Sequence, residues 1–196
     1  PNLKQEFSSL DEGLQWAEEG RELLKKTIAA EWAKSDRNKD TIFERPSRGF
    51  QPWFAKIADH VEVVDPGLKS RESAERKLKN DYNGEVENLK DLARMSFVFT
   101  DCSSMLNTMK YLQNLKGWKM LLCKNKYASP TPLGYSDVNT IFSIPISHGR
   151  RVLCEIQFHM KDMIEAKEEE THAYYDNIRK LLPRMCAGQE GVDSDT

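Results

Sequence analysis

Three groups of polar residues in this sequence have the types and spacing that phosphoryl-transfer chemistry needs. A basic segment begins at Lys69, Asp91 stands just before an apolar stretch, and Glu155 lies inside a later one. Two carboxylates on neighbouring strands can hold Mg²⁺, which prefers oxygen ligands and commonly keeps waters and substrate phosphates. A basic helix beside them would neutralise phosphate charge. Together the three groups are the minimum set for phosphoryl or nucleotidyl transfer.

Glu155 belongs to the most regular stretch of the chain, residues 150–159, which is predicted to be a strand. One face of this strand would carry Val152, Cys154, Ile156 and Phe158, and the other would carry Leu153, Glu155, Gln157 and His159. The first face suits a core, and the second places an acid, an amide and an imidazole in a row. A carboxylate in a strand is costly unless something pairs with it. A site for a metal or a cationic substrate would provide that pairing, and an edge strand with a hydrated polar face is the alternative.

The basic segment, residues 69–78, is predicted to be a helix. The spacing i, i+4, i+8 would place Lys69, Ser73 and Lys77 on one face, with Arg76 beside them. Like charges on one face repel each other. The face is therefore either simply solvated or the binding site of an anion such as phosphate, and this segment alone leaves both interpretations open.

The remaining pattern predicts the elements that must position these residues. Ser9 and Glu12 form a capping box at the start of a long amphipathic helix that runs from Leu10 to about Lys34. Residues 50–60 are predicted to be a second helix. Further strands are expected at 94–100, 118–123 and 138–146, with helices at 101–115 and from 161 to about 182. This order predicts an α+β fold, with a mixed β-sheet of four to five strands flanked by helices.

Length and composition favour one domain, residues 1–185, with a core at 67–180, N-terminal helices at 9–60 and a disordered polar tail at 186–196. The formal net charge of −2 gives no general attraction to nucleic acid or anionic membranes. No apolar run approaches the about 20 residues that span a bilayer. The four scattered cysteines are typical of reduced thiols. We therefore expect an intracellular, cytoplasmic protein.

The order of the polar groups resembles the synthetase domain of the RelA/SpoT family. The matching pieces are Lys69-Ser70-x-x-Ser73-x-x-x-Lys77, Asp91-Leu92-Ala93, Gly134-Tyr135, Glu155-Ile156-Gln157 and a helical His172. The resemblance covers about residues 67–178 and implies a nucleotidyltransferase-like sheet. Members of this family make the alarmone (p)ppGpp by moving pyrophosphate from ATP to the 3′-hydroxyl of GDP or GTP.

The resemblance implies a role for each matching residue. Asp91 and Glu155 would hold Mg²⁺, and Glu155 would also be the general base on the attacking 3′-hydroxyl. Tyr135 would stack on the acceptor base, and Gln157 would support the acceptor site. The ATP phosphates would be bound by Lys69, Ser73 and Lys77, with Arg76 and Arg94 as further nucleotide-binding candidates. The alternatives are that Asp91 is a turn carboxylate, Tyr135 a loop aromatic that fills the core, and His172 a packed surface histidine.

The sequence also departs from the family pattern. Cations usual in the family are replaced at several positions, and Arg94 stands where a glycine is usual. The replacements are Gly67 and Ser96 for arginines, Thr131 for a basic residue, Asn139 for a histidine, and His159 for a basic residue. Arg71, Arg76, Arg94, Lys124 and Lys126 are candidates to supply the missing positive charge.

These observations lead to three hypotheses. The first is a divergent pyrophosphokinase that uses ATP, Mg²⁺ and a nucleotide acceptor such as GDP or GTP. The second is a toxin-like member that acts on adenine nucleotides or on the 3′ end of tRNA. The third is a catalytically weak nucleotide-binding or interaction module that keeps the fold. The retained Asp91 and Glu155 favour an enzyme, and the missing cations favour the module.

Overall fold

A six-stranded mixed sheet is the centre of the molecule, with strand order β1-β2-β3-β6-β5-β4. The computed structural model describes residues 3–35, 53–58, 60–131 and 134–168. The strands are β1 (Trp53–Ala58), β2 (Val61–Asp65), β3 (Ala93–Phe99), β4 (Lys119–Asn125), β5 (Val138–Pro145) and β6 (Arg151–Met160). The helices are α1 (Leu10–Ser35), α2 (Arg71–Asp81), α3 (Cys102–Gln113) and α4 (Lys161–Glu168), with short 3₁₀ turns at Val86–Asn88 and Ser147–Gly149. The predicted α+β class is confirmed, and β1 and β2 bring the number of strands to six.

The central pair of strands, β3 and β6, is parallel, and every other pair in the sheet is antiparallel. Arg94 of β3 lies opposite Glu155, and Ser96 lies opposite Gln157. On the other side of β6, Asn139 of β5 is also opposite Gln157. Residues in register share one face of a sheet. Polar residues from three strands therefore meet on one face.

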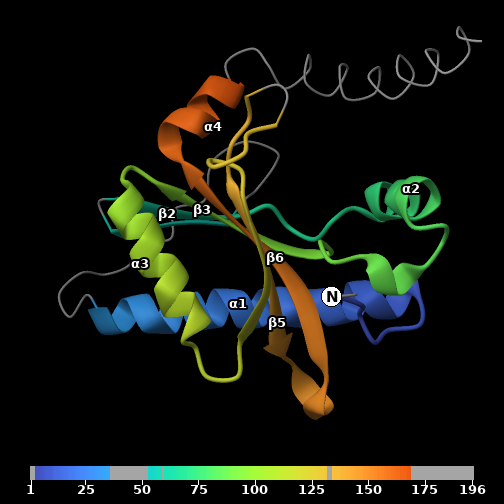
Figure 1. Ribbon diagram of the computed structural model, residues 1–196. Coiled ribbons are helices and arrows are strands. Elements are labelled where there is room, and N and C mark those ends of the chain that lie inside the picture. Colours follow the sequence, from blue (N-terminus) through green and yellow to red (C-terminus); the bar gives the residue numbers. More distant parts are fainter. Residues whose placement is uncertain (1–2, 36–52, 59, 132–133, 169–196) are drawn as a thin grey trace, which may run out of the picture.

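The opposite face of the sheet is the hydrophobic core. Val152, Cys154, Ile156 and Phe158 are fully buried there, as their alternation predicts. Helix α1 runs along this face (Figure 1). The contact is close at Gly20, where an added Cβ would come within 2.6 Å of a methyl group of Val152. Burial on this side leaves the polar row of β6 on the other side for chemistry.

Helix α1 begins as the sequence predicts. The hydroxyl of Ser9 accepts a hydrogen bond from the amide of Glu12 at 3.2 Å. The Glu12 carboxylate accepts from the amide and hydroxyl of Ser8 instead of closing the box on Ser9. The helix ends at Ser35, close to the predicted Lys34.

The prediction of a helix at residues 50–60 is wrong. Residues 53–58 form the edge strand β1, paired antiparallel with β2. A short run of aromatic and aliphatic residues suits a helix or a strand equally, and only the pairing partner decides between them. That partner, β2, was itself not predicted, although its residues alternate between buried and half-buried positions.

Helix α2 begins later than predicted. Ser70 is its N-cap and accepts a hydrogen bond from the amide of Ser73 at 3.2 Å. Lys69 therefore precedes the helix and does not lie on its face with Ser73 and Lys77. The helix ends at a turn in which Asn83 and Gly84 both have positive φ.

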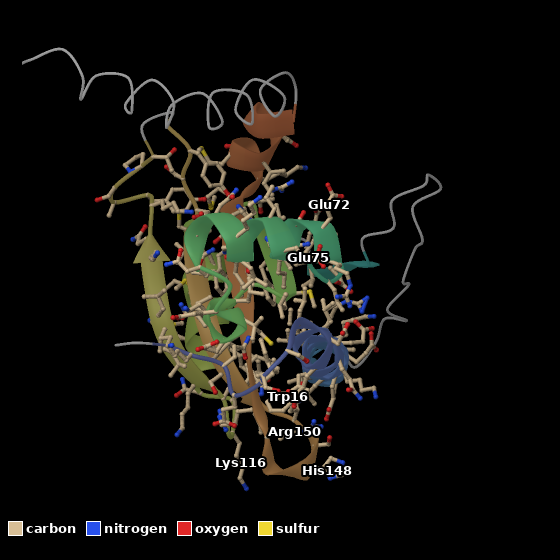
Figure 2. The ribbon with its side chains drawn as sticks, turned by 90° about the vertical axis from the view of Figure 1, so that its right-hand side faces the viewer. Trp16, Glu72, Glu75, Lys116, His148 and Arg150 are labelled. Carbon is tan, nitrogen blue, oxygen red and sulfur yellow. The ribbon has the colours of Figure 1, made fainter. Side chains whose placement is uncertain are left out.

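At the far end of the β5–β6 hairpin, Trp16 and Arg150 lie together near the turn that contains His148 (Figure 2). The Arg150 guanidinium lies 4.8 Å from the centre of the Trp16 ring. It also pairs with Glu19 at 3.2 Å. These contacts fix the hairpin to α1.

The C-terminal predictions are only partly covered by the structure. The final helix is described over Lys161–Glu168 as α4. Its predicted continuation to residue 182, the helical His172 and the tail at 186–196 lie outside the described residues. Among the helices that are described, none combines the length and apolar character needed to cross a membrane.

Candidate active site

Asp91, just before β3, is shared by two ammonium groups. Its Oδ2 atom accepts hydrogen bonds from Lys69 at 3.0 Å and from Lys77 at 2.9 Å. Burial alone would raise the pKa of Asp91, but the two lysines outweigh it and hold that pKa below its usual value. The other oxygen, Oδ1, is buried and accepts no hydrogen bond within the described part of the chain.

Lys77 pairs with Asp91 and also responds to the charge of Glu155. Burial would lower the pKa of Lys77, but Asp91 chiefly raises it, and the charge of Glu155 adds to the increase. The ammonium group of Lys77 is therefore close enough to both acids to respond to their charge. The structure brings Lys69, Lys77, Asp91 and Glu155 together.

Both oxygens of Glu155 are held by amide groups. Asn139 donates to Oε1 at 2.6 Å, and Gln157 donates to Oε2 at 3.1 Å. These donors are uncharged, so they orient the carboxylate without neutralising it. The side-chain amide oxygen of Gln157, Oε1, in turn lies 3.2 Å from Nε2 of His159. The row of polar groups on β6 is thus a continuous hydrogen-bonded chain.

Tyr135 lies at the end of this chain. Its hydroxyl donates to the buried carboxylate of Asp137 at 2.9 Å and lies 3.5 Å from Nδ1 of His159. The ammonium of Lys126 is 2.8 Å from Asp137 and 5.2 Å from the centre of the Tyr135 ring. The ring predicted to stack on the acceptor base is therefore fixed in place by a charged cluster.

The other predicted nucleotide-binding residues differ in their placement. Arg94 is half-buried opposite Glu155, donates weakly to the carbonyl of Leu68 at 3.4 Å, and has an Nε that is buried without a partner among the described residues. Ser73 is half-buried in the first turn of α2. Arg76 is exposed, and no ion pair within the described part of the chain joins it to Asp91 or Glu155.

Several departures from the family pattern have local structural roles. Gly67 has a φ of +73° and donates its amide to Asp65 at 2.8 Å. The hydroxyl of Thr131 accepts from the amide of Tyr135 at 3.1 Å. Asn139 and His159 belong to the hydrogen-bonded chain on β6. These positions now orient neighbouring groups within the fold.

Sequence reasoning missed one group of residues beside the site. The ring of Tyr82, at the end of α2, has the ammonium of Lys77 at 5.5 Å and that of Lys90 at 5.8 Å from its centre. Burial lowers the pKa of Lys90, and repulsion by Lys77 and Lys124 lowers it further. The signal available in the sequence was a lysine directly before Asp91.

The sequence was compared with protein families and with known proteins. No family model matches the chain. The (p)ppApp synthetase toxin Tas1 of Pseudomonas aeruginosa (strain UCBPP-PA14) is 34% identical over 111 residues, which are 57% of this chain and 23% of that protein. This chain therefore matches about a quarter of the length of that curated relative.

Solved structures agree on the fold. Small alarmone synthetase 2 from Bacillus subtilis superposes with a TM-score of 0.65 at 18% identity, over 88% of this chain and 83% of that one. The type VI effector Tas1, in complex with its immunity protein, superposes with a TM-score of 0.52 at 26% identity, over 82% and 66% of the two chains. The resemblance to the RelA/SpoT synthetases is confirmed. The chain is thus similar to RelA/SpoT-like synthetases, and its helices and mixed sheet have the small alarmone synthetase fold.

Proposed function

We propose that this RelA/SpoT-like chain is a nucleotide pyrophosphokinase that transfers pyrophosphate from ATP to the 3′-hydroxyl of a nucleotide. The observation that carries the proposal is the contact of Lys77 with Asp91 at 2.9 Å, near enough to Glu155 for its charge to help raise the pKa of Lys77. It puts a phosphate-binding cation, a candidate metal ligand and a candidate base in one place. The likeness to pyrophosphate-transferring proteins supports the same reaction.

On the donor side, positive charge would bind and orient the ATP phosphates. Lys69 and Lys77 supply ammonium groups, Arg94 supplies a half-buried guanidinium, and Ser73 supplies a hydroxyl on the first turn of α2. Phosphoryl transfer depends mainly on positioning and on neutralising charge. The same cations would stabilise AMP as it leaves.

On the acceptor side, Glu155 would act as the general base. The 3′-oxygen attacks the β-phosphorus of ATP, the bond from that phosphorus to the oxygen bridging the α-phosphorus breaks, and the 3′-hydroxyl proton passes to Glu155. Asn139 and Gln157 hold the carboxylate in one orientation. Because their amides add no charge, they position the carboxylate without forming an ion pair with it.

The donor atoms fit a Mg²⁺ ion. The Oδ1 atom of Asp91 is buried and lacks a partner within the described residues, which leaves an oxygen for a metal. No group of three or more His, Cys, Asp or Glu side chains able to hold a metal occurs in the described residues. Asp91 and Glu155 would therefore hold the ion as a pair, with phosphate oxygens and waters completing its shell. Bound there, Mg²⁺ would polarise the phosphates and offset their charge.

Three kinds of acceptor are compatible with this proposal. The family resemblance favours GDP or GTP, and small alarmone synthetase 1 from Bacillus subtilis has been solved with its product pppGpp. The identity with Tas1, a (p)ppApp synthetase toxin, favours an adenine nucleotide. Tyr135 suits either purine because stacking on an aromatic ring does not select a base. The 3′ end of tRNA is a third acceptor of the same chemical type.

The test is incubation of the purified chain with γ-labelled ATP, Mg²⁺ and a panel of GDP, GTP, ADP, ATP and tRNA. Transfer of label to a 3′-position, with release of AMP, would support the pyrophosphokinase. The labelled product also identifies the acceptor. If no acceptor in the panel becomes labelled, the pyrophosphokinase proposal fails and the nucleotide-binding module takes its place.

A further inference from the structure

Two lysine ammonium groups lie over the ring of Tyr82, beside the candidate site. Lys77 and Lys90 place their ammonium groups 5.5 and 5.8 Å from its centre, and Lys124 is close enough to repel Lys90. Each ammonium group is attracted to the face of the aromatic ring. Repulsion among the three ammonium groups opposes that attraction. An anion bound among them would remove the repulsion.

The carboxylates near this cluster do not balance its charge. Asp91 pairs with both Lys69 and Lys77, and Glu155 is close enough to help raise the pKa of Lys77, so these two acids offset the charge of these two lysines only. Neither Lys90 nor Lys124 forms an ion pair with a carboxylate in the part of the chain that the structure describes. Positive charge is therefore in excess where α2 meets β3.

We propose that Lys90, together with Lys77 and the ring of Tyr82, binds the polyphosphate of the nucleotide donor. The proposal rests on the function proposed above and adds to it a cation that stands outside the family motif. Lys77 joins this cluster to Asp91, so an anion bound here lies beside the candidate metal ligand. In this way Lys90 compensates for positive charge that is absent at Gly67 and Ser96.

A nucleotide polyphosphate fits this cluster better than the backbone of an RNA. The ammonium groups surround one ring and continue into the site through Lys77. A nucleic acid backbone is usually followed by a line of cations along a groove. A triphosphate instead presents several charges within a few ångströms, which matches two lysines at the ring of Tyr82 and a third, Lys124, near enough to repel Lys90.

The test uses inorganic tripolyphosphate, titrated calorimetrically into the full chain without nucleotide. Lys90→Ala should raise its Kd about tenfold, the loss expected for one charge-assisted contact. The salt dependence of binding should also become shallower. Lys79→Ala is the matched control, because Lys79 is an exposed lysine on the same helix as Lys77. It should change the Kd less than twofold. Near-UV circular dichroism checks that each variant is folded.

Equal Kd values for wild type, Lys90→Ala and Lys79→Ala would overturn the proposal. So would a Lys90→Ala variant that binds tripolyphosphate normally but loses affinity for a single-stranded RNA oligonucleotide, because the cluster would then be an RNA surface. A wild-type chain that binds tripolyphosphate through Lys90 but transfers no pyrophosphate would support this inference and contradict the proposed enzyme.

Discussion

Asp91 shows how one side chain serves stability and chemistry together. The side chain of Asp91 is 13% exposed, and those of its partners Lys69 and Lys77 are 15% and 28% exposed. Burying charged groups away from water costs free energy unless they remain paired with opposite charges. Oδ2 therefore keeps the two lysines proposed to bind phosphate in place before a nucleotide arrives, and Oδ1 is the atom proposed to bind a metal.

Asp91→Asn should lower the free energy of unfolding by about 1–2 kcal/mol at neutral pH, because it leaves two partly buried lysines without their counter-charge. The folded pKa of Asp91 lies below the ordinary value of 3.8. The stabilisation is thus complete above about that pH and is lost as pH falls through the folded pKa. The difference between variant and wild type should therefore shrink in strongly acidic buffer.

Chemical denaturation at several pH values measures this difference. Asp81→Asn is the control, because Asp81 is exposed at the end of α2. A variant Asp91→Asn that is as stable as wild type at neutral pH would show that the lysine pairs contribute nothing to the fold.

Gly67 explains one departure from the family pattern in terms of the backbone. Its φ of +73° is a conformation that side chains with a Cβ rarely adopt, although nothing lies within 4 Å of an added Cβ. Restoring the family residue through Gly67→Arg should cost about 1–2 kcal/mol of stability. Gly67→Asn should cost less, because asparagine tolerates this region. Urea unfolding compares the two, and equal stability of Gly67→Arg and wild type would refute the backbone explanation.

At the scale of elements, the packing of α1 on the sheet depends on a close approach at Gly20. Alanine favours helices by about 1 kcal/mol over glycine. A Cβ at this position would nevertheless lie 2.6 Å from a methyl group of Val152. Gly20→Ala should therefore destabilise the protein by about 1–3 kcal/mol, the usual effect of overpacking. A double-mutant cycle with Val152→Ala should show coupling between the sites, and additive effects would contradict the contact.

The elements also show how far the sequence could predict this fold. The alternation in β6 and the capping at Ser9 predicted local structure well, because each depends on neighbours in the chain. Strand β1 was missed because its state depends on pairing with β2, a contact that its own residues do not encode. Lys69 was expected on a helix and precedes one, yet it still reaches Asp91. The hydrogen bond from Asn139 to Glu155 depends on the register of β5 with β6 and could not be predicted from the sequence.

At the scale of the whole molecule, one hydrophobic cluster runs from Phe7 to Phe158 and includes residues of α1, α2, α3 and the central strands. The parallel pairing of β3 with β6 joins the N-terminal and C-terminal parts of the sheet. The described part of the predicted domain, residues 1–185, therefore shares one core.

A single core predicts one cooperative unfolding transition. Leu24→Ala in α1 and Ile156→Ala in β6 each remove a fully buried side chain and should each cost about 2–5 kcal/mol. Each should shift the transition seen by far-ultraviolet circular dichroism and the one seen by tryptophan fluorescence equally. Two separate transitions, each moved by only one of the substitutions, would contradict the single domain.

The central claim is that Glu155 is the base of a pyrophosphate transfer, and turnover of labelled ATP by Glu155→Gln tests it most directly. The substitution keeps the shape of the side chain but removes its charge, so turnover should fall by at least about 10²–10⁴-fold, the usual contribution of a general base. Glu75→Gln, at an exposed residue of α2 (Figure 2) that pairs with Arg71, is the control and should transfer at the wild-type rate. Equal transfer by wild type and Glu155→Gln would contradict the account.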